Sequence, residues 1–115
     1  FDDPVAMLLT GASIAPAGPV NTTIGLVATD AQITKEDANY LARVSHDGLA
    51  LAIRPCHTVR DGDSMFAMAT GHNRSHVDLT SLGAAAVEAT AQAVLRAVRK
   101  ATGLGGIPSI SELAA

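Results

Sequence analysis

Two short apolar runs alternate with two longer stretches of helical periodicity along the middle of the chain. The first run, at 22–31, reads TTIGLVATDA and is rich in β-branched residues. Such a run, closed by polar residues, is typical of a strand that is buried on both faces. The second run, at 64–69, reads SMFAMA and follows Asp61-Gly62-Asp63. Because that triplet favours a turn, the run predicts a second strand.

Each predicted strand is followed by a stretch that predicts a helix. Thr34 suits the N-cap of the first helix, and Asp37 stands three residues later, close to a capping box. Apolar residues then recur at helical spacing until Pro55 ends the run. An alanine-rich helix is expected at about 79–101, with basic residues near its end and Gly103 as its stop. The order strand, helix, strand, helix predicts the α/β (α+β) class.

The remaining segments carry turn-forming and polar residues. Residues 1–9 begin with charge and proline before they turn apolar, and we interpret them as the end of a helix or strand from an earlier segment. Residues 10–20 read TGASIAPAGPV, which is typical of a flexible linker. A polar loop is expected at 71–75, and 103–115 is expected to be a loosely attached tail.

The core must be built largely from alanine, valine and leucine. Hydrophobic residues make up 48% of the 115 residues, but aromatic residues only 3%, and tryptophan is absent. Since aromatic side chains commonly line small-molecule pockets, we expect a partner chain to supply part of any site. A chain of this length is also short for an enzyme that needs both a core and a pocket, so the sequence is expected to be incomplete.

Charge and cysteine content exclude several classes of partner. The formal net charge is −3 and the eight Lys and Arg residues are scattered, so no nucleic acid ligand is predicted. A single cysteine cannot form an internal disulfide, and the sequence shows neither a signal segment nor an apolar run long enough to cross a membrane. These features predict a soluble, cytoplasmic protein without a membrane partner.

Asn21-Thr22 joins the predicted linker to the predicted first strand. A threonine at this place is most simply a strand-forming residue. Cleavage of the Asn21-Thr22 bond, however, would leave Thr22 as an N-terminal residue held on a rigid element. Such a threonine carries its own base, because its α-amine has an ordinary pKa of about 7.7 to 8.0. The amine could take the hydroxyl proton during attack and return it to the leaving amine.

Before that cleavage the Thr22 hydroxyl can act only on the carbonyl of Asn21. The attack gives an ester that water resolves, and this exposes the amine. Asp61 and Asp63 are candidate partners of Thr22, since two carboxylates at the entrance of a strand could orient or polarise its hydroxyl and amine. The simpler interpretation of these two acids is a solvated turn.

Histidine and cysteine residues do not predict a metal site. The Cys56-His57 pair is adjacent, and His72 and His76 fall in a polar loop rather than on a helix face. His46 is interpreted as a hydrogen-bonded structural residue of the first helix, and Cys56 as a small buried hydrophobe. No cofactor is predicted either.

Three blocks of sequence carry a resemblance to a known family. NTTIGLVATDA, HDGLALAIRP and DGDSMFAMATG stand in this order within about 21–71. In order and spacing they resemble the β-subunit of the L-aminopeptidase D-Ala-esterase/amidase family. These self-processing N-terminal nucleophile hydrolases include nylon-oligomer hydrolase and pantetheine hydrolase, and the blocks resemble the threonine type.

The resemblance implies that a longer precursor cuts itself between Asn21 and Thr22. Residues 1–21 would then be the C-terminal end of the α-part with its linker, and 22–115 would be the β-subunit. It also implies an amide hydrolase of the aminopeptidase or amidase type, with Thr22 as the catalytic nucleophile. The substrate would be a small amide or peptide, since family members cleave peptides, ω-amino acid oligomers or pantetheine.

The resemblance further implies the site and the assembly. Asp61 and Asp63 match the acidic pair that threonine-type members place beside the nucleophile, while Ser64 stands where threonine is frequent. The implied fold is a four-layer α-β-β-α sandwich, of which this chain forms a strand-helix-strand-helix segment. A separate α-subunit from the same precursor would complete the sandwich and supply the oxyanion donors. Members commonly form tetramers of αβ units, so an oligomer of αβ units is expected.

Two other functions stay open on the sequence alone. Ornithine acetyltransferases also resemble the chain in VATDA and DGD, and they pass an acyl group to an amine rather than to water. The segment MFAMATG at 65–71 favours the hydrolase pattern. The other alternative is a non-catalytic interaction module that completes the sheet of a partner.

Overall fold

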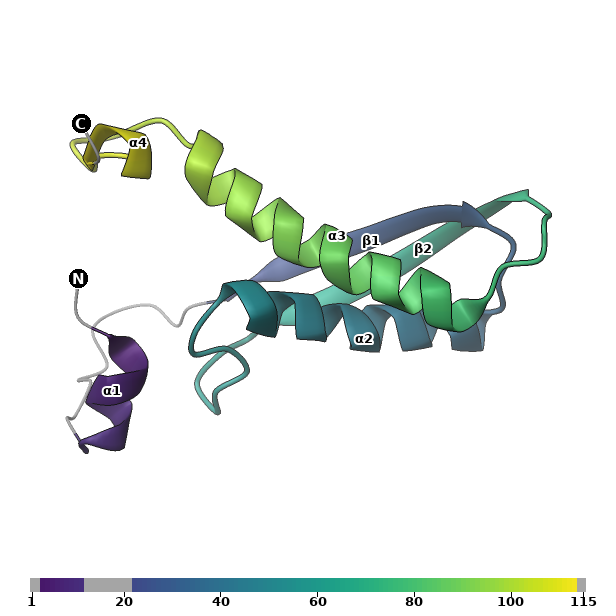
Figure 1. The fold of residues 1–115 in the computed structure, drawn as a ribbon, viewed down its shortest axis with the longest axis horizontal. Coiled ribbons are helices and arrows are strands. Elements are labelled where there is room, and N and C mark those ends of the chain that lie inside the picture. The colour runs from purple at the N-terminus through teal and green to yellow at the C-terminus, as the bar shows by residue number, and fades with distance from the viewer. Residues whose placement is uncertain (1–2, 12–21, 114–115) are drawn as a thin grey trace.

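A pair of parallel strands, each followed by a helix, forms the centre of the molecule (Figure 1). The computed structural model describes residues 3–11 and 22–113. Its elements are α1 (Pro4–Leu9), β1 (Ile24–Ala31), α2 (Lys35–Ala52), β2 (Ser64–Asn73), α3 (Leu79–Lys100) and α4 (Ile110–Leu113). The predicted order of strand, helix, strand and helix and the mixed α/β class are therefore confirmed for the central elements.

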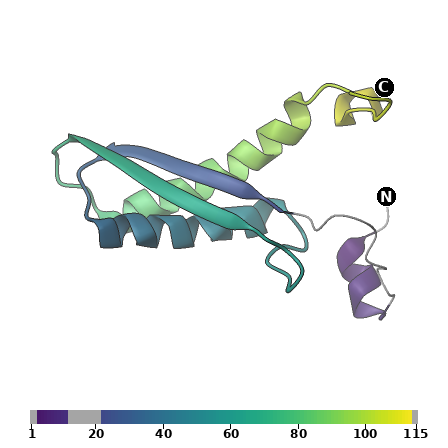
Figure 2. The same ribbon diagram turned by 180° about the vertical axis from the view of Figure 1, so that it is seen from behind.

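The two helices α2 and α3 lie on the same face of the two-stranded sheet. Figures 1 and 2, which view the ribbon from opposite sides, show both helices on one side of β1 and β2. The strands pair in parallel from Ile24 opposite Ser64 to Thr29 opposite Ala69. The same end of the sheet therefore carries the beginnings of both strands, and residues just ahead of each strand become neighbours.

Local signals determine where α2 begins and ends. The Thr34 hydroxyl accepts a hydrogen bond from the Asp37 amide at 3.1 Å, and the Asp37 carboxylate accepts one from the Thr34 amide at 3.0 Å. The predicted capping box is thus confirmed. The helix ends at Ala52, before Pro55, whose ring disfavours helical geometry in the preceding residue.

The polar loop expected at 71–75 is only partly a loop, because β2 continues to Asn73. Pairing with β1 is irregular at this end: Thr29 pairs with Ala69, but Ala31 pairs with Asn73. Gly71 has a φ of +67°, a conformation that glycine adopts without a steric penalty, and it stands within the irregularity. A bulge of this kind lets polar residues continue a strand that local sequence would end.

The contact between α2 and α3 depends on a glycine. Gly48 of α2 is buried, and a Cβ added to it would clash with the backbone carbonyl oxygen of Val87 and approach the Thr90 Cβ to 2.7 Å. Leu41 and Leu49 of α2 are fully buried beside this crossing. The small side chain at residue 48 therefore allows the backbones of the two helices to approach closely.

We predict that Gly48→Ala lowers the free energy of unfolding by about 1–3 kcal/mol, because overpacking forces the helices apart. Gly83→Ala is the matched control. Its added Cβ would meet the end of the flexible Tyr40 side chain at 3.0 Å, and both substitutions bring the same gain in helix propensity. Denaturant unfolding of the full-length protein measures the difference, and equal stabilities of the two variants would contradict the close-approach argument.

Within 3–11 and 22–113, the first strand is covered on one face only. Helices cover one face, whereas Ile24 and Leu26 of β1 are 73% and 59% exposed on the other. Phe66 and Met68 of β2 are 58% and 49% exposed beside them. The apolar run was correctly predicted to be a strand, but its second covering layer does not come from the described residues. We call these four residues the bare sheet face.

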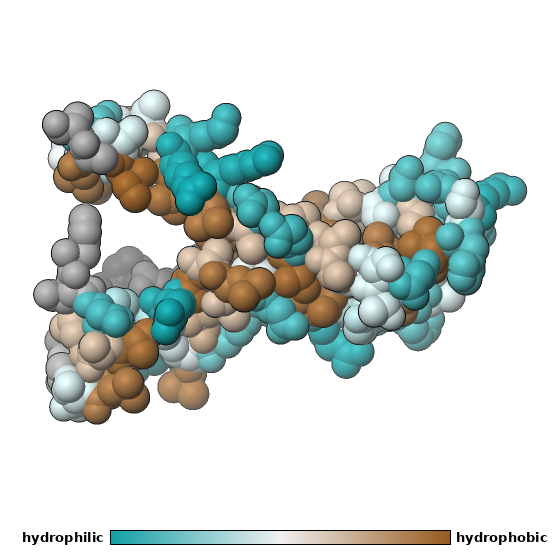
Figure 3. Space-filling model, viewed as in Figure 1, coloured by the Kyte–Doolittle hydropathy of each residue, from teal (hydrophilic) through white to brown (hydrophobic). Residues whose placement is uncertain are grey.

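The tail expected to be loosely attached has local structure. Leu104 and Ile107 form a short bridge, and the Glu112 carboxylate accepts hydrogen bonds from the amides of Gly103 and Ser109. The end of α3 and this tail form an arm, and Figure 3 shows hydrophobic side chains along the lower edge of that arm.

Among residues 3–11 and 22–113, no helix combines the length and apolarity that crossing a membrane requires.

Candidate active site

Thr22 lies two residues before the start of β1, with its hydroxyl against the loop that leads into β2. A Cβ added to Gly62 would stand 2.8 Å from the Thr22 Oγ1, so the hydroxyl occupies the space that the glycine leaves open. Thr22 itself is exposed. Asn21, and with it the predicted cleavage bond Asn21-Thr22, lies outside the described residues.

Parallel pairing brings Thr22 and the acidic loop together. The Thr23 carbonyl oxygen accepts a hydrogen bond from the Ser64 amide at 2.8 Å, which begins the ladder between the strands. Asp61, Gly62 and Asp63 immediately precede Ser64, just as Thr22 precedes Thr23. Because both strands run in the same direction, these two segments meet at the same edge of the sheet.

Asp63 is the carboxylate that holds the beginning of β1. Its Oδ1 accepts a hydrogen bond from the Thr23 amide at 2.9 Å, across 40 residues of sequence. Its Oδ2 accepts from the Cys56 thiol at 3.3 Å and from the His57 amide at 3.4 Å. Partial burial by itself would raise the pKa of Asp63, but these hydrogen bonds outweigh it and lower the pKa below its ordinary value. Asp63 is therefore an anion at neutral pH.

Asp61 stabilises the loop itself. Its carboxylate accepts a hydrogen bond from the Thr58 amide at 2.9 Å, and its own amide donates to the Thr58 carbonyl oxygen at 3.1 Å. This double contact closes the turn from Thr58 to Asp61, directly ahead of Gly62. The two acids are therefore not equivalent, since Asp63 contacts the strand that bears Thr22 whereas these contacts of Asp61 stay within the loop.

Cys56 is not the buried hydrophobe that the sequence suggested. It is half-buried, and its thiol donates a hydrogen bond to Asp63. Burial raises the pKa of the Cys56 thiol to about 11, with further contributions from the hydrogen bond to Asp63 and from the negative charges of Asp63 and Asp61. Cys56 is consequently a protonated thiol at neutral pH. The hydrogen bond between Cys56 and Asp63 was not predicted, because the sequence pattern does not indicate the conformation of the loop that contains both residues.

His46 is hydrogen-bonded, as predicted. Its Nδ1 lies 2.7 Å from the Nε2 of His57, which has a φ of 56° in the loop after α2. His57 thereby links α2 to the loop around Asp63. His72 belongs to the far end of β2, and His76 follows that strand, so both stand apart from the site.

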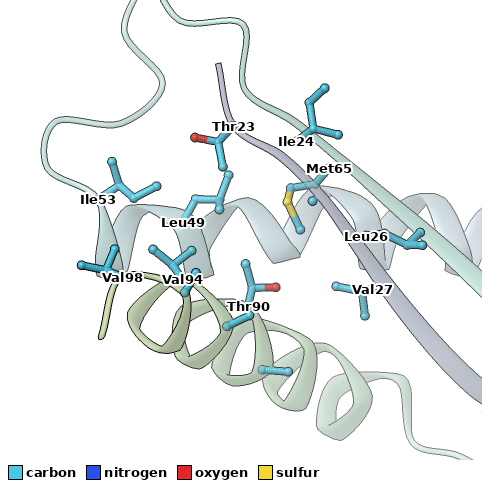
Figure 4. A pocket seen from close by; sticks show the side chains of 14 residues that line it. Thr23, Ile24, Leu26, Val27, Leu49, Ile53, Met65, Thr90, Val94 and Val98 are labelled. Carbon is cyan, nitrogen blue, oxygen red and sulfur yellow. The ribbon is translucent and has the colours of Figure 1, made fainter. Parts of the chain in front are cut away.

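An apolar cavity of about 400 Å³ begins beside the site, between β1, α2 and α3. Thr23, the residue after Thr22, is one of its lining residues (Figure 4). Others that Figure 4 labels are Leu49, Ile53, Met65, Thr90 and Val94. The polar groups of the site thus adjoin a hydrophobic hollow that this chain leaves partly open.

Comparison with known proteins gives one family and a consistent set of relatives. The model of peptidase family S58 matches residues 3–110. An uncharacterized aminopeptidase of Mycobacterium leprae (strain TN) is 41% identical over 108 residues, which cover 83% of this chain and 30% of the relative. A 6-aminohexanoate-oligomer endohydrolase of Kocuria sp. (strain KY2) is 33% identical over 90 residues, which cover 69% of this chain and 25% of the relative.

A further relative is an uncharacterized aminopeptidase of Mycobacterium tuberculosis (strain ATCC 25618 / H37Rv). It is 39% identical over 108 residues, and the match covers 83% of this chain and 31% of the relative. The chain thus spans less than a third of the length of these relatives.

Proposed function

This chain belongs to peptidase family S58, and from that premise we propose that it is the nucleophile-bearing part of an amide hydrolase that cuts itself between Asn21 and Thr22. The observation that carries the proposal is the position of the Thr22 hydroxyl against Gly62, beside the carboxylate that holds the Thr23 amide. The names of the relatives, an aminopeptidase and an endohydrolase of 6-aminohexanoate oligomers, favour cleavage of amide bonds.

In the self-cleavage step the Thr22 Oγ attacks the carbonyl carbon of Asn21. The carbon–nitrogen bond breaks, the acyl group moves to oxygen, and the proton lost by the hydroxyl passes to the Thr22 nitrogen, which leaves as a free amine. Water then hydrolyses the ester, which releases the Asn21 carboxylate and restores the hydroxyl. The position of the Thr22 hydroxyl against the loop that contains Asp61 and Gly62 favours this step, because that loop limits the attacking oxygen on one side.

In the hydrolytic step the new α-amine of Thr22 acts as base. It takes the proton of the hydroxyl as the oxygen attacks the substrate carbonyl, and it returns that proton to the leaving amine. Water resolves the acyl-enzyme ester by the same route. Asp63 fixes the Thr23 amide and so orients residue 22, and its negative charge favours the ammonium form that arises on the α-amine.

We propose that the remainder of the same precursor covers the bare sheet face. A sheet with one apolar face exposed needs a second layer, and Ile24, Leu26, Phe66 and Met68 provide that face. More than two thirds of the length of the relatives lies outside the matched segment, so there is enough chain to form the layer. The result would be the α-β-β-α sandwich, assembled into oligomers of αβ units.

The decisive experiment expresses the full-length protein that contains this chain. Intact-mass analysis and N-terminal sequencing are expected to show a new N-terminus at Thr22 in the active material. Peptides with a free N-terminus, ω-amino acid oligomers and pantetheine amides are then screened for hydrolysis. An active enzyme whose residue 22 is still in a peptide bond would overturn the proposal, and acyl transfer from N-acetylornithine to glutamate would replace hydrolase with transferase.

We predict that Gly62→Ala slows both self-cleavage and hydrolysis by about 100-fold, because the new Cβ displaces the Thr22 hydroxyl from its place. Time courses of precursor cleavage and initial rates of hydrolysis measure the two effects. Val59→Ala is the control in the same loop, since Val59 is fully exposed and is expected to leave both rates unchanged. Equal rates for Gly62→Ala and the parent protein would show that the hydroxyl works from another position.

A further inference from the structure

Cys56, His57 and Asp63 bring three kinds of metal ligand together beside Thr23. One donor atom from each lies within 4.8 Å of the other two. The Cys56 Sγ and the Asp63 Oδ2 are 3.3 Å apart, close to the separation of about 3.5 Å between two ligands of a tetrahedral zinc ion. We propose that this cluster binds a zinc-type transition-metal ion that inhibits the active site, an inference that rests on the proposed function.

The donor set selects the class of metal. One sulfur, one imidazole nitrogen and one carboxylate oxygen suit zinc and similar borderline ions, whereas magnesium and calcium prefer oxygen ligands alone. Cys56 and Asp63 are half-buried and His57 is exposed, so an ion can reach the cluster from solvent. Three protein ligands leave the fourth tetrahedral position to water.

His46 supplies a second, independent feature of metal sites. A histidine that binds a metal through one ring nitrogen usually donates the N–H of the other nitrogen to a fixed acceptor. The Nε2 of His57 lies 2.7 Å from the Nδ1 of His46, which stands on the rigid helix α2. When Nε2–H donates in this contact, the lone pair on the Nδ1 of His57 is available for a metal.

Electrostatics also favour a cation at this place. The carboxylates of Asp63 and Asp61, which belong to the same loop as the cluster, attract a divalent ion to this position. Binding exchanges the thiol proton for the metal, so the Cys56 sulfur–hydrogen bond breaks, a sulfur–metal bond forms and one proton passes to solvent. No oxidant or reductant takes part.

Metal binding is expected to inhibit through Asp63. The same carboxylate that would bind the ion through Oδ2 holds the Thr23 amide through Oδ1. Coordination shifts the Asp63 carboxylate toward the metal and neutralises its charge. The Thr22 amine then has less negative charge near it. The proposed base then loses the group that favours its protonated form.

The binding test uses the full-length processed protein, freed of metal by a chelator. Cobalt(II) serves as the spectroscopic probe for a zinc site, and one equivalent is expected to produce a sulfur-to-cobalt charge-transfer band that zinc abolishes by competition. Cys56→Ala should lose the band, and His57→Ala should weaken binding at least tenfold. His72→Ala, outside the cluster, is the control and should bind like the parent. Absence of the band, or equal weakening by His72→Ala, would overturn the proposal.

The inhibition test measures amide hydrolysis with and without zinc. Zinc is expected to lower the rate of the parent at least tenfold, a chelator should restore it, and the rate of Cys56→Ala relative to its own metal-free rate should be insensitive. A cobalt band without any effect of zinc on the rate would overturn the inhibitory role. Cobalt binding in a protein that is never cut before Thr22 would support the metal site and refute the proposed function. Failure of the metal proposal and failure of the proposed function therefore give different results.

Discussion

Thr22→Ala in the full-length protein is expected to give one unbroken chain whose amide hydrolysis is lowered about 10⁴-fold or more. Alanine has no hydroxyl to attack the Asn21 carbonyl, so the α-amine that would serve as base is never released. Gel electrophoresis and intact-mass analysis reveal the uncut chain, and initial rates measure the loss of hydrolysis. The effect is large because one substitution removes the nucleophile and, through the lack of cleavage, the base.

Thr22→Ser is the informative control for that experiment. Serine keeps both the hydroxyl and, after cleavage, the α-amine, so the variant should still cut at the same bond and retain measurable activity. The position next to Gly62 accommodates the smaller side chain without a clash. If the Thr22→Ala chain splits at the same bond as the parent, then the hydroxyl of residue 22 is not the attacking group.

Asp63→Asn is expected to lower the rate of hydrolysis about 100-fold while the protein stays folded. The substitution removes a negative charge, and it turns a hydrogen-donating amide group toward groups that are themselves donors, the Cys56 thiol and the His57 amide, or toward the Thr23 amide. Asp61→Asn provides the comparison. An asparagine there can still accept the Thr58 amide, so its effect is expected to be at least tenfold smaller.

The pH dependence of the unfolding free energy gives a second test of the role of Asp63. Its pKa in the folded protein lies below the ordinary value, so the carboxylate stabilises the fold at neutral pH and this contribution disappears as pH falls through the folded pKa. The difference in unfolding free energy between the parent and Asp63→Asn should therefore shrink in acid. A difference that is constant with pH, or equal rates for the Asp61 and Asp63 variants, would contradict the assigned roles.

The candidate site was only partly predictable from sequence. Thr22 and the acidic pair were predicted to be site residues because the blocks that contain them resemble a family. Their spacing alone also fitted a strand-forming threonine and a solvated turn. The different contacts of the two acids were not predictable. Asp61 and Asp63 stand two residues apart in the same loop, and no local signal indicates which of them faces Thr23. Cys56 was misassigned, since a cysteine after proline carries no sequence signal that it will donate to a carboxylate seven residues later.

Local interactions explain the features that could be predicted from the order of residues. The order of strands and helices, the capping box at Thr34 and the end of α2 before Pro55 each depend on residues within a few positions of one another. Contacts between residues far apart in the chain, in contrast, became known only from the folded arrangement. Parallel pairing of β1 with β2 places Asp63 on the Thr23 amide, and packing of both helices on one side leaves Ile24 and Phe66 exposed. Strand register and the choice of covered face depend on contacts between distant segments, which no local pattern specifies.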